Sequence, residues 1–429
     1  MKNEIISLVS DYAAEKLKSK DFVPGKTRIP ASGPSLSQED VETLTEAVLS
    51  LWYTEGKYCA KFRQSLRNEN GKAFVTLCNS GSSASLLAMK SCLEHFGSKD
   101  YVITCGVNFP TTVAPIYQCG QIPIYIDIDP KTLTPNMEQL EHAVYTYRGK
   151  ISGAIFAHTL GFPFDEQSVY NTVAEGGGFL ISDCCDAMGA KLSNELKVGF
   201  FSDAITLSFF PAHHITTGEG GAVLTDNDFL GPRIESNANW GRDCYCSPGQ
   251  ENTCGKRFEH EWDKLPEGYD HKYTFTTLGY NLKMTEWQAA LGYSQIQRLP
   301  LFVSERIKNY KYLLRNLYIF HDWIDIGLLQ FVGQASPFGL PIMVNTDAFE
   351  TSELIQYLEQ HKVSTRRVFA GNITRQPGYQ KMPKVAYDLS GSDKVMEDMF
   401  WIGCHPSLTR DMMNYVIEVF DKFFKEKNL

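Results

Sequence analysis

One stretch is the most informative part of the chain: Ser208-Phe-Phe-Pro-Ala-His-His-Ile-Thr-Thr-Gly-Glu-Gly-Gly221. It begins at the last residue of the apolar run 204–208, and such a run is typical of a buried strand. It holds two adjacent histidines, His213 and His214, and no lysine. Adjacent side chains rarely share one metal ion, and the chain has no H-E-x-x-H helix, so a zinc site is disfavoured here. A histidine can move a proton near neutral pH. The stretch is therefore a candidate for acid–base chemistry, beside the alternative that both histidines are structural.

Upstream of this stretch, short apolar runs alternate with helical patterns. Continuous apolar strands between helices indicate an α/β fold, with a mostly parallel sheet covered by helices on both faces. Because ligands of such sheets bind beyond the carboxyl ends of the strands, the residues that directly follow each run are candidates for a site. The runs are residues 74–77, 101–104, 122–126, 153–156, 179–182 and 204–208.

Three units are predicted along the chain. Residues 1–35 form an N-terminal arm with a helix, residues 36–295 a large domain, and residues 296–429 a smaller α+β domain. Within the large domain, residues 232–285 lose periodicity and are rich in Cys, Gly, Asp and aromatic residues. A stretch of this length without regular structure is often functional.

Charge and composition narrow the classes of partner. The net charge of −9 argues against nucleic acid or an anionic membrane as the main partner. No run approaches the length of a transmembrane helix, and the N-terminus lacks the apolar core of a signal peptide, so we expect a cytoplasmic protein. In that compartment the 11 cysteines are not expected to form a disulfide framework, and metal ligands or reactive thiols are expected instead.

Polar and aromatic residues follow three of the predicted strands. Gly81, Ser82 and Ser83 open a helix, where free N–H groups can hold a phosphate; an ordinary helix cap is the alternative. Asp183 ends a strand, where a carboxylate can keep a pyridine nitrogen protonated or, alternatively, cap a helix. Phe109 can stack on a planar ring or belong to the core.

These segments occur together in an order and spacing that resembles the nucleotide-sugar aminotransferase family, the DegT/DnrJ/EryC1/StrS family. The resemblance implies the fold type I architecture of enzymes that use pyridoxal phosphate (PLP), with Ser208 at the cofactor. It also implies a homodimer with shared active sites, because the asparagine matching Asn281 reaches the cofactor phosphate of the neighbouring subunit. The matching motifs are Ser-Gly-Ser-Ser (80–83), Phe-Pro-Thr-Thr (109–112), Asp-Cys-Cys-Asp-Ala-Met-Gly (183–189), the 208–221 stretch and Gly-Tyr-Asn-Leu-Lys-Met-Thr-Glu-Trp-Gln-Ala-Ala (279–290).

His213 stands where that family has the lysine that binds PLP as a Schiff base. An imidazole cannot form that imine but can abstract a proton, which favours a lyase over a transaminase. Residues 240–249 and 369–377 resemble one branch of the family, the 3-dehydrases of CDP-4-keto-6-deoxy-D-glucose. That branch implies pyridoxamine phosphate (PMP) as cofactor and His213 as the base that drives loss of the 3-hydroxyl. It also implies a partner flavin/iron–sulfur reductase, whose electrons arrive through an iron–sulfur cluster.

Cys185, Cys244, Cys246 and Cys254 have the spacing C-x58-C-x-C-x7-C, and four thiolates can hold a 2Fe-2S cluster. The branch resembled has a near-identical spacing, with one residue fewer in the long gap and a further cysteine where this chain has Gln250. Cys184 or Cys185 would then have to supply the fourth ligand. Buried free thiols are the alternative.

Cationic residues are candidates for the nucleotide diphosphate. Guanidinium groups bind phosphate bidentately, and the resemblance favours Arg375 over Arg366 and Arg367, which equally fit solvated surface charges. Lys283 and His214 are assigned to the substrate as well.

Three other functions are considered, and His213 argues against the second of them, while intact Asp183, Ser208 and His213 argue against the third. The first is a 3-dehydratase that needs no iron and recycles its cofactor with glutamate; the relatives of this kind lack the Cys-Tyr-Cys segment. The second is a true aminotransferase, for which Lys191 and Lys197 lie in the wrong segment to replace the missing amine. The third is a non-catalytic protein that keeps the fold.

Overall fold

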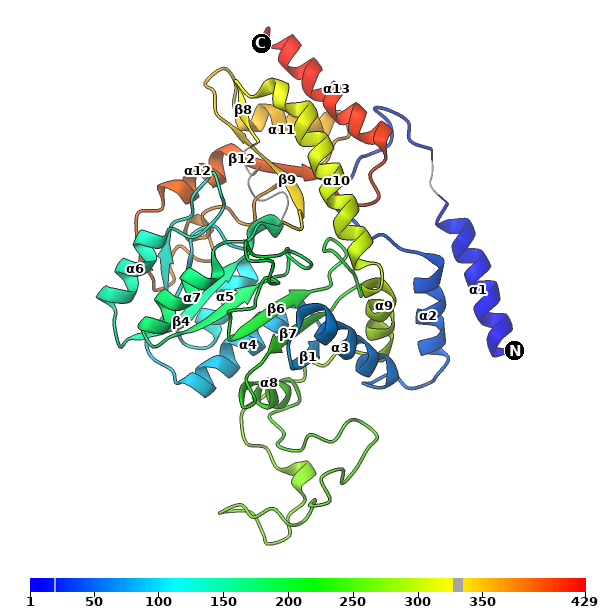
Figure 1. Cartoon of the computed structure of the whole chain (residues 1–429), viewed down its shortest axis with the longest axis vertical. Coiled ribbons are helices and arrows are strands. Elements are labelled where there is room, and N and C mark those ends of the chain that lie inside the picture. Colours follow the sequence, from blue (N-terminus) through cyan, green and yellow to red (C-terminus); the bar gives the residue numbers. More distant parts are fainter. Residues whose placement is uncertain (19–20, 327–334) are drawn as a thin grey trace.

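A large sheet forms the centre of the protein (Figure 1). The computed structural model describes residues 1–18, 21–326 and 335–429. Within those residues the sheet has eight strands, and β7 runs antiparallel to both of its neighbours while the other pairs are parallel. This confirms the predicted, mostly parallel α/β sheet. In spatial order the strands are β1 (Phe74–Cys78), β7 (Gly221–Thr225), β6 (Ala204–Ser208), β5 (Phe179–Asp183), β4 (Ile151–Ala157), β2 (Tyr101–Cys105), β3 (Ile122–Ile126) and β11 (Val385–Ala386).

Helices cover both faces of this sheet, which is why its strands are apolar along their whole length. Successive side chains of a strand point to opposite faces. In β5, Ile181 packs with α4 and α8, whereas Leu180 packs with α6 and α7 on the other face. The helices α3 and α9 cover that second face over β1, β7 and β6. The bounds are α3 (Lys57–Asn70), α4 (Gly81–Phe96), α5 (Pro110–Gln118), α6 (Met137–Thr146), α7 (Glu166–Glu175), α8 (Leu230–Ala238) and α9 (Glu286–Ile296).

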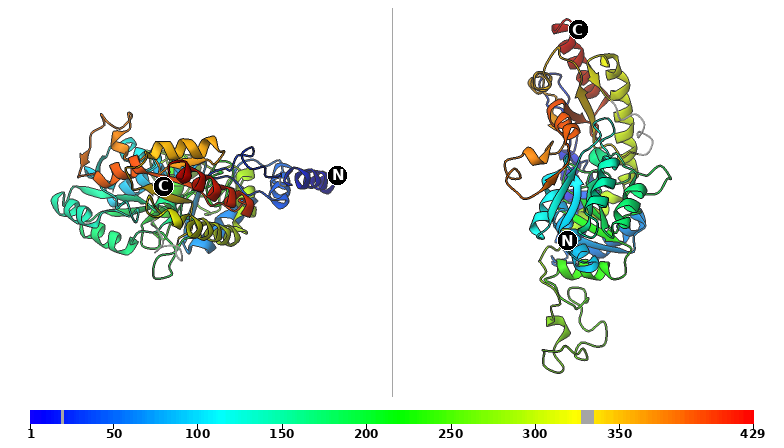
Figure 2. Two further views of the ribbon diagram at one scale, coloured as in Figure 1. Left: turned by 90° about the horizontal axis from the view of Figure 1, so that it is seen from above. Right: turned by 90° about the vertical axis from the view of Figure 1, so that its left-hand side faces the viewer.

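The C-terminal part builds a smaller α+β unit, as predicted (Figure 2). Its four described strands form an antiparallel sheet that packs with α10, α11 and α13 around one apolar core. The chain also returns to the large sheet, because β11 pairs in parallel with the outer edge of β3. The elements are β8 (Ile324–Asp325), β9 (Gly339–Val344), β10 (Thr365–Arg367), β12 (Met399–Gly403), α10 (Leu299–Leu317), α11 (Thr351–Gln360), α12 (Ser390–Asp398) and α13 (Arg410–Glu426).

The N-terminal region lies along the outside of α9. Helix α1 (Lys2–Lys16) stands at the rim of the molecule, and α2 (Gln38–Val48) lies between it and α9 (Figures 1 and 2). Asp40 of α2 is buried and accepts hydrogen bonds from Ser294 Oγ at 2.7 Å and Gln295 Nε2 at 2.6 Å. The start of α2 is thereby fixed to the large domain. The domain limits 1–35, 36–295 and 296–429 stay predictions.

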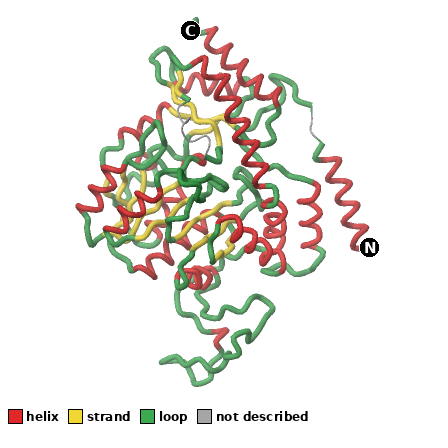
Figure 3. The backbone as a smooth tube through the Cα atoms, viewed as in Figure 1, coloured by secondary structure: helices red, strands yellow, loops and turns green. Residues whose placement is uncertain are grey.

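Residues 239–285 form a long projection from the large domain (Figure 3). Apart from the short 3-10 helix η2 (His271–Tyr273), the described chain is irregular there, in agreement with the loss of periodicity. At the neck, Gly241 has a φ of +79° and a Cβ on it would overlap Thr277 O, so glycine is required by both conformation and space. The two sides of the neck are joined by Trp240 N donating to Tyr280 O at 2.6 Å and Asp243 N donating to Thr274 O at 3.0 Å.

None of the helices in the described ranges combines the length and the apolar character that crossing a bilayer would take.

Candidate cofactor and active site

Asp183 lies at the carboxyl end of β5, and the rest of the site is arranged around it. Its carboxylate is buried and accepts hydrogen bonds from Thr112 Oγ1 at 2.7 Å and from Cys185 N at 3.1 Å. Thr112 belongs to α5, so a helix and a strand together fix the direction of this carboxylate. A buried carboxylate fixed in this way has the chemistry needed to pair with a protonated ring nitrogen.

The start of α4 lies against the ends of β5 and β6. A Cβ placed on Gly81 would come within 2.5 Å of Ser208 Cβ and 3.3 Å of Cys185 Sγ. These three predicted residues are therefore brought together, and only a glycine permits the approach. Ser83 N donates to Ser80 Oγ at 3.1 Å, which leaves the first two N–H groups of the helix, those of Gly81 and Ser82, for an anion. The start of α4 thus offers free N–H donors, and its role in holding a phosphate stays a prediction.

Phe109 borders the site as the residue before α5. Its ring is 50% exposed and meets the Phe369 ring edge-on at 6.2 Å. Phe109 is thus not a core aromatic, and stacking of its ring on a planar ligand stays a prediction. Residues 369–373 run beside the strand end 106–108, since Ile373 N donates to Gly106 O at 2.9 Å and Ala370 N donates to Asn108 O at 3.0 Å. The second segment that carries the branch resemblance therefore lies at the site.

His213 faces a carboxylate that the sequence did not single out. Its Nδ1 lies 3.3 Å from Asp186 Oδ1, and its side chain is 16% exposed. Asp186 follows Asp183, the last residue of β5, by three positions, so the strand end and the loop after it each supply one carboxylate. The two atoms do not form a hydrogen bond in this structure, but a carboxylate beside Nδ1 favours a proton on that nitrogen and a lone pair on Nε2. The signal for Asp186 was its place in the Asp-Cys-Cys-Asp motif.

Arg306 is a second residue of the site that the sequence did not indicate. It lies on α10, its side chain is fully buried, and its guanidinium donates to Phe338 O at 3.1 Å and His213 O at 3.4 Å. Burial lowers the pKa of this guanidinium. Arg306 thereby ties the main chain of His213 to the C-terminal domain. No local pattern distinguishes this arginine from the other charged residues of α10, such as Lys308 and Arg315.

His214 is buried in the protein interior. Its Nε2 donates to Ser336 O at 2.9 Å, and burial lowers its pKa well below the ordinary value. It is therefore a neutral, structural histidine in this structure. The predicted contact between His214 and substrate gains no support from this placement.

Asn281 and Lys283 lie together at the base of the projection. Lys283 Nζ donates to Asn281 Oδ1 at 2.8 Å and to Asn239 Oδ1 at 2.9 Å, and it lies 3.6 Å from the centre of the Trp240 ring. Burial lowers the pKa of Lys283. Asn79 N donates to Leu282 O at 2.8 Å, so this segment borders the phosphate loop. The contact of Asn281 with a neighbouring subunit stays a prediction.

The predicted arginines differ in how their guanidinium groups are used. Arg375 is 47% exposed and already donates to Asp393 Oδ1 at 2.9 Å and Glu397 Oε1 at 2.6 Å, two carboxylates of α12. A diphosphate would have to compete with both. Arg367 donates to main-chain carbonyls at the end of α12, among them Glu397 O at 3.1 Å, and therefore has a structural role. Arg366 is exposed and donates to Thr365 O at 2.7 Å.

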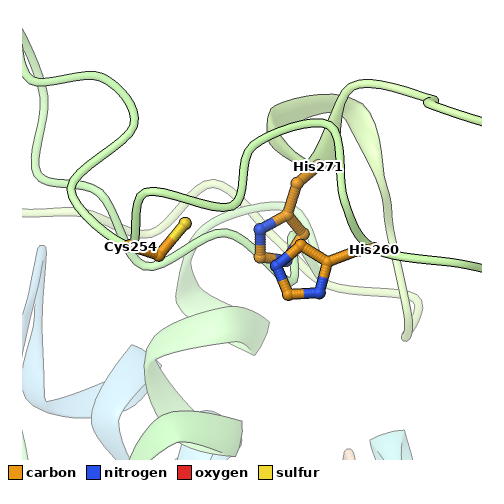
Figure 4. Close-up of side chains that lie close together, drawn as sticks. All are labelled: Cys254, His260 and His271. Carbon is orange, nitrogen blue, oxygen red and sulfur yellow. The ribbon is translucent and has the colours of Figure 1, made fainter.

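Three of the four predicted cluster cysteines come together in the projection. Cys244, Cys246 and Cys254 line one cavity, together with His271. Cys185 is instead part of the cofactor site, where it contacts Gly81 and Ser208, and burial raises the pKa of its thiol well above the ordinary value. Cys184 packs in the apolar core under β6. Figure 4 shows two histidines beside Cys254 that the sequence had not suggested, His260 and His271.

The sequence and the structure were compared with known proteins. The model of the DegT/DnrJ/EryC1/StrS aminotransferase family matches residues 34–421. The chain is 40% identical to the lipopolysaccharide biosynthesis protein RfbH of Salmonella typhimurium, over 99% of this chain and 98% of that protein. It is also 40% identical to dTDP-4-dehydro-2,6-dideoxy-D-glucose 3-dehydratase of Saccharopolyspora spinosa, over 98% of this chain and 92% of that one.

Among solved structures, the chain resembles the E. coli GDP-4-keto-6-deoxy-D-mannose-3-dehydratase with bound hydrated PLP. The TM-score is 0.80 at 24% identity, covering 92% of this chain and 99% of that one. This likeness concerns the fold, which is that of the PLP-dependent aminotransferases. With a sheet of this topology and a family model that matches most of its length, the chain belongs to the DegT/DnrJ/EryC1/StrS aminotransferase family.

Proposed function

We propose that this protein catalyses the PMP-dependent loss of the 3-hydroxyl from a nucleotide-linked 4-keto-6-deoxyhexose, CDP-4-keto-6-deoxy-D-glucose. The observation that carries the proposal is His213, a proton-transfer group on the loop after β6 where the aminotransferases of the family place a lysine. A relative named as a 3-dehydratase, 40% identical over nearly the whole chain, supports the reaction type. Its substrate carries a different nucleotide, so CDP rests on the resemblance of residues 240–249 and 369–377.

The residues of the site fit PMP. Asp183 would hold the ring nitrogen protonated, the N–H groups of Gly81 and Ser82 and the Ser208 hydroxyl would hold the phosphate, and Phe109 would cover the ring. Asn281 of a partner subunit would complete the phosphate site in a homodimer. When bound, PMP supplies an amine that condenses with the 4-keto group and an electron-poor ring that accepts charge as the 3-hydroxyl leaves.

His213 then acts as the base. With the Asp186 carboxylate beside Nδ1, His213 would offer the lone pair of Nε2 as the base toward the methylene group of bound PMP. The imidazolium that results is stabilised by the same carboxylate and can return its proton to the departing hydroxyl. Arg306 keeps the main chain of His213 in place during both transfers.

Complete removal of the 3-hydroxyl needs a reduction in addition to the dehydration. The substrate, two electrons and two protons give the 3-deoxy sugar and water, so a reductant must be supplied. We assign this role to a partner flavin/iron–sulfur reductase acting through a cluster in residues 244–271, where three cysteines share a cavity.

Oxygen exchange at C3 tests the dehydration by itself. Reversible loss of the 3-hydroxyl in H2(18)O places 18O at C3 and requires PMP but neither iron nor reductase. We expect exchange with the native protein and a decrease of about 10²- to 10⁴-fold with His213→Asn, while PMP binding is retained. Normal exchange by His213→Asn would contradict the assignment of the base.

A second candidate is the iron-free, glutamate-dependent 3-dehydratase. The position of Cys185 in the cofactor site favours it, because the predicted four-cysteine set is not assembled within one chain. Turnover of the keto sugar with glutamate as the only added co-substrate, in iron-free protein, would establish this alternative.

A further inference from the structure

The turn 368–371 carries a strained residue beside the cofactor site. Phe369 has a φ of +48°, which lies in the left-handed region. Gly371 N donates to Val368 O at 2.9 Å, and this bond makes Phe369 the first central residue of the turn. Turns with a positive φ at this position ordinarily have glycine, asparagine or aspartate there. A bulky residue in this conformation costs free energy and persists only where the surrounding structure imposes it.

The surroundings of the turn fix it from two sides. Val368 is buried in the apolar core of the C-terminal unit, and Phe369 packs against the same core. On the other side, Ala370 N donates to Asn108 O at 3.0 Å, on the segment that follows β2. The strained turn is therefore held between the C-terminal core and the strand end that leads into α5.

This conformation brings the ring of Phe369 against the ring of Phe109. The two ring centroids lie 6.2 Å apart and the planes meet at 65°, which is the favoured edge-to-face arrangement of an aromatic pair. Phe109 is 50% exposed, so the core does not enclose its ring. The contact with Phe369 therefore contributes to holding that ring in one orientation.

The main chain of Phe109 is fixed by other contacts. Asn108, the residue before it, is buried and donates through Nδ2 to a carbonyl at the end of β2 at 2.8 Å. The carbonyl of Pro110, the residue after it, accepts a hydrogen bond from the Tyr379 hydroxyl at 3.1 Å. The freedom that remains is rotation of the Phe109 side chain between its rotamers. Phe369 is the residue that acts on this rotation.

We propose that Phe369 is a positioning residue of the cofactor site, which holds the Phe109 ring in the orientation that covers PMP. The C-terminal unit thereby helps to align a cofactor whose other proposed contacts come from the large domain. The inference rests on the proposed function, in which Phe109 covers the PMP ring. It gives the segment 369–377 a role in cofactor binding, in addition to the contact with the nucleotide that the resemblance implies for Arg375.

Two variants of the full-length chain separate positioning from packing. Phe369→Ala and Phe369→Gly both remove the ring, but only glycine adopts the positive φ without strain, so Phe369→Gly should unfold at a higher urea concentration than Phe369→Ala. Titration with PMP should show binding that is about two- to tenfold weaker than in the native chain, by the same factor in both variants, as expected for the loss of one aromatic pair. Affinities that follow the order of stability, or native affinity in either variant, would overturn the inference.

A double-mutant cycle with Phe109 tests whether the effect passes through that ring. Phe369→Leu should weaken PMP binding in the native background and have no further effect when Phe109→Leu is present. The circular dichroism of the bound cofactor, at saturating PMP, should decrease in Phe369→Leu because the ring that covers it is held less firmly. Additive losses of affinity, or an unchanged dichroic signal, would contradict a positioning role.

Tyr379→Phe is the matched control for the segment. It removes only the hydrogen bond to Pro110 O and keeps both rings of the pair, so it should bind PMP as tightly as the native chain. A loss as large as that of Phe369→Leu would show that any loosening around residue 109 suffices, and would refute the particular role of Phe369.

Failure of the proposed function is read separately, from oxygen exchange at C3. A chain that binds PMP and shows the coupling between residues 109 and 369, but exchanges no oxygen, would refute the proposed reaction and support the positioning role. Normal exchange, with PMP binding that is indifferent to Phe369, would refute the positioning role alone. A native chain that binds no PMP would refute both.

Discussion

The cofactor site and the projection are built in opposite ways. At the cofactor site, Gly81 meets Ser208 and Cys185, and Cys185 N donates to Asp183, because β1, β5 and β6 all end at one edge of a buried sheet. In the projection, the ligand atoms meet through turns and ion pairs, and the chain there has almost no regular structure. The first site inherits its geometry from the core of the fold. The second has to be stabilised locally, by its own side chains and by whatever it binds.

The largest expected effect is at the cofactor site. If residue 213 faces the cofactor as proposed, His213→Lys should bind PLP covalently, giving a yellow protein whose cofactor resists dialysis. C3 oxygen exchange should fall by about 10²- to 10⁴-fold, since the imidazole is lost and the new amine holds the cofactor as PLP instead of PMP. Absorption spectra before and after dialysis check the first point, and the cluster spectrum of the same sample serves as the control. A colourless protein would mean that residue 213 does not face the cofactor.

Acid should destabilise the body of the protein. Burial, together with the Arg306 cation, lowers the pKa of His405 to about 4, and His405 Nε2 donates to Pro30 O at 3.1 Å. The pKa of His214 is lowered as well. Unfolded chains bind these protons near pH 6.5, so the contribution to stability is complete above that pH and is lost as pH falls toward 4, by about 1.4 kcal/mol per pKa unit for each group.

Urea unfolding between pH 7 and pH 4.5 measures this loss. His405→Gln should make the free energy of unfolding less dependent on pH over this interval. Gly241→Ala, at the neck of the projection, should leave the dependence unchanged. An unaltered slope in His405→Gln would show that the buried histidine is not the group that titrates.

Two glycines provide a matched pair across the two regions. Gly81→Ala forces a Cβ against Ser208 and should weaken PMP binding, at a cost of about 1–3 kcal/mol, while cluster loading persists. Gly241→Ala strains a residue with a φ of +79° and should lower cluster loading at a similar cost of about 1–3 kcal/mol, while PMP binding persists. Titration with PMP measures cofactor binding, and iron content measures cluster loading, in each variant. If each variant lost both ligands, the regions would not be independent.

The smallest expected effect concerns Asp186. Asp186→Asn removes the charge beside His213 Nδ1 but keeps the shape, and should slow C3 oxygen exchange by roughly tenfold, which corresponds to about 1.4 kcal/mol. Asp186→Glu should restore part of the rate. Equal rates for Asp186→Asn and the native protein would remove the carboxylate from the mechanism.

The same contrast explains what the sequence could predict. The strands and the residues that follow them were predictable because apolar runs and small polar loops are local signals, and Asp183, Ser208 and the start of α4 lie where they were expected. The role of Arg306 and the place of His271 were not predictable, because both depend on contacts with residues far away in the chain. Arg306 reaches His213 across 93 positions, and His271 depends on Asp243 across 28. The cysteine spacing suggested a cluster, but it could not reveal that Cys185 lies in another site.

The short strand β11 has a consequence for how the protein is made. It pairs with the outer edge of β3, yet it lies at residues 385–386, more than 250 positions later in the chain. On the ribosome, β3 must therefore wait with an open edge until most of the C-terminal domain has been synthesised. An open strand edge invites pairing with other chains. Nascent chains stalled before residue 385 should consequently be the aggregation-prone species, however complete the rest of the large domain is by then.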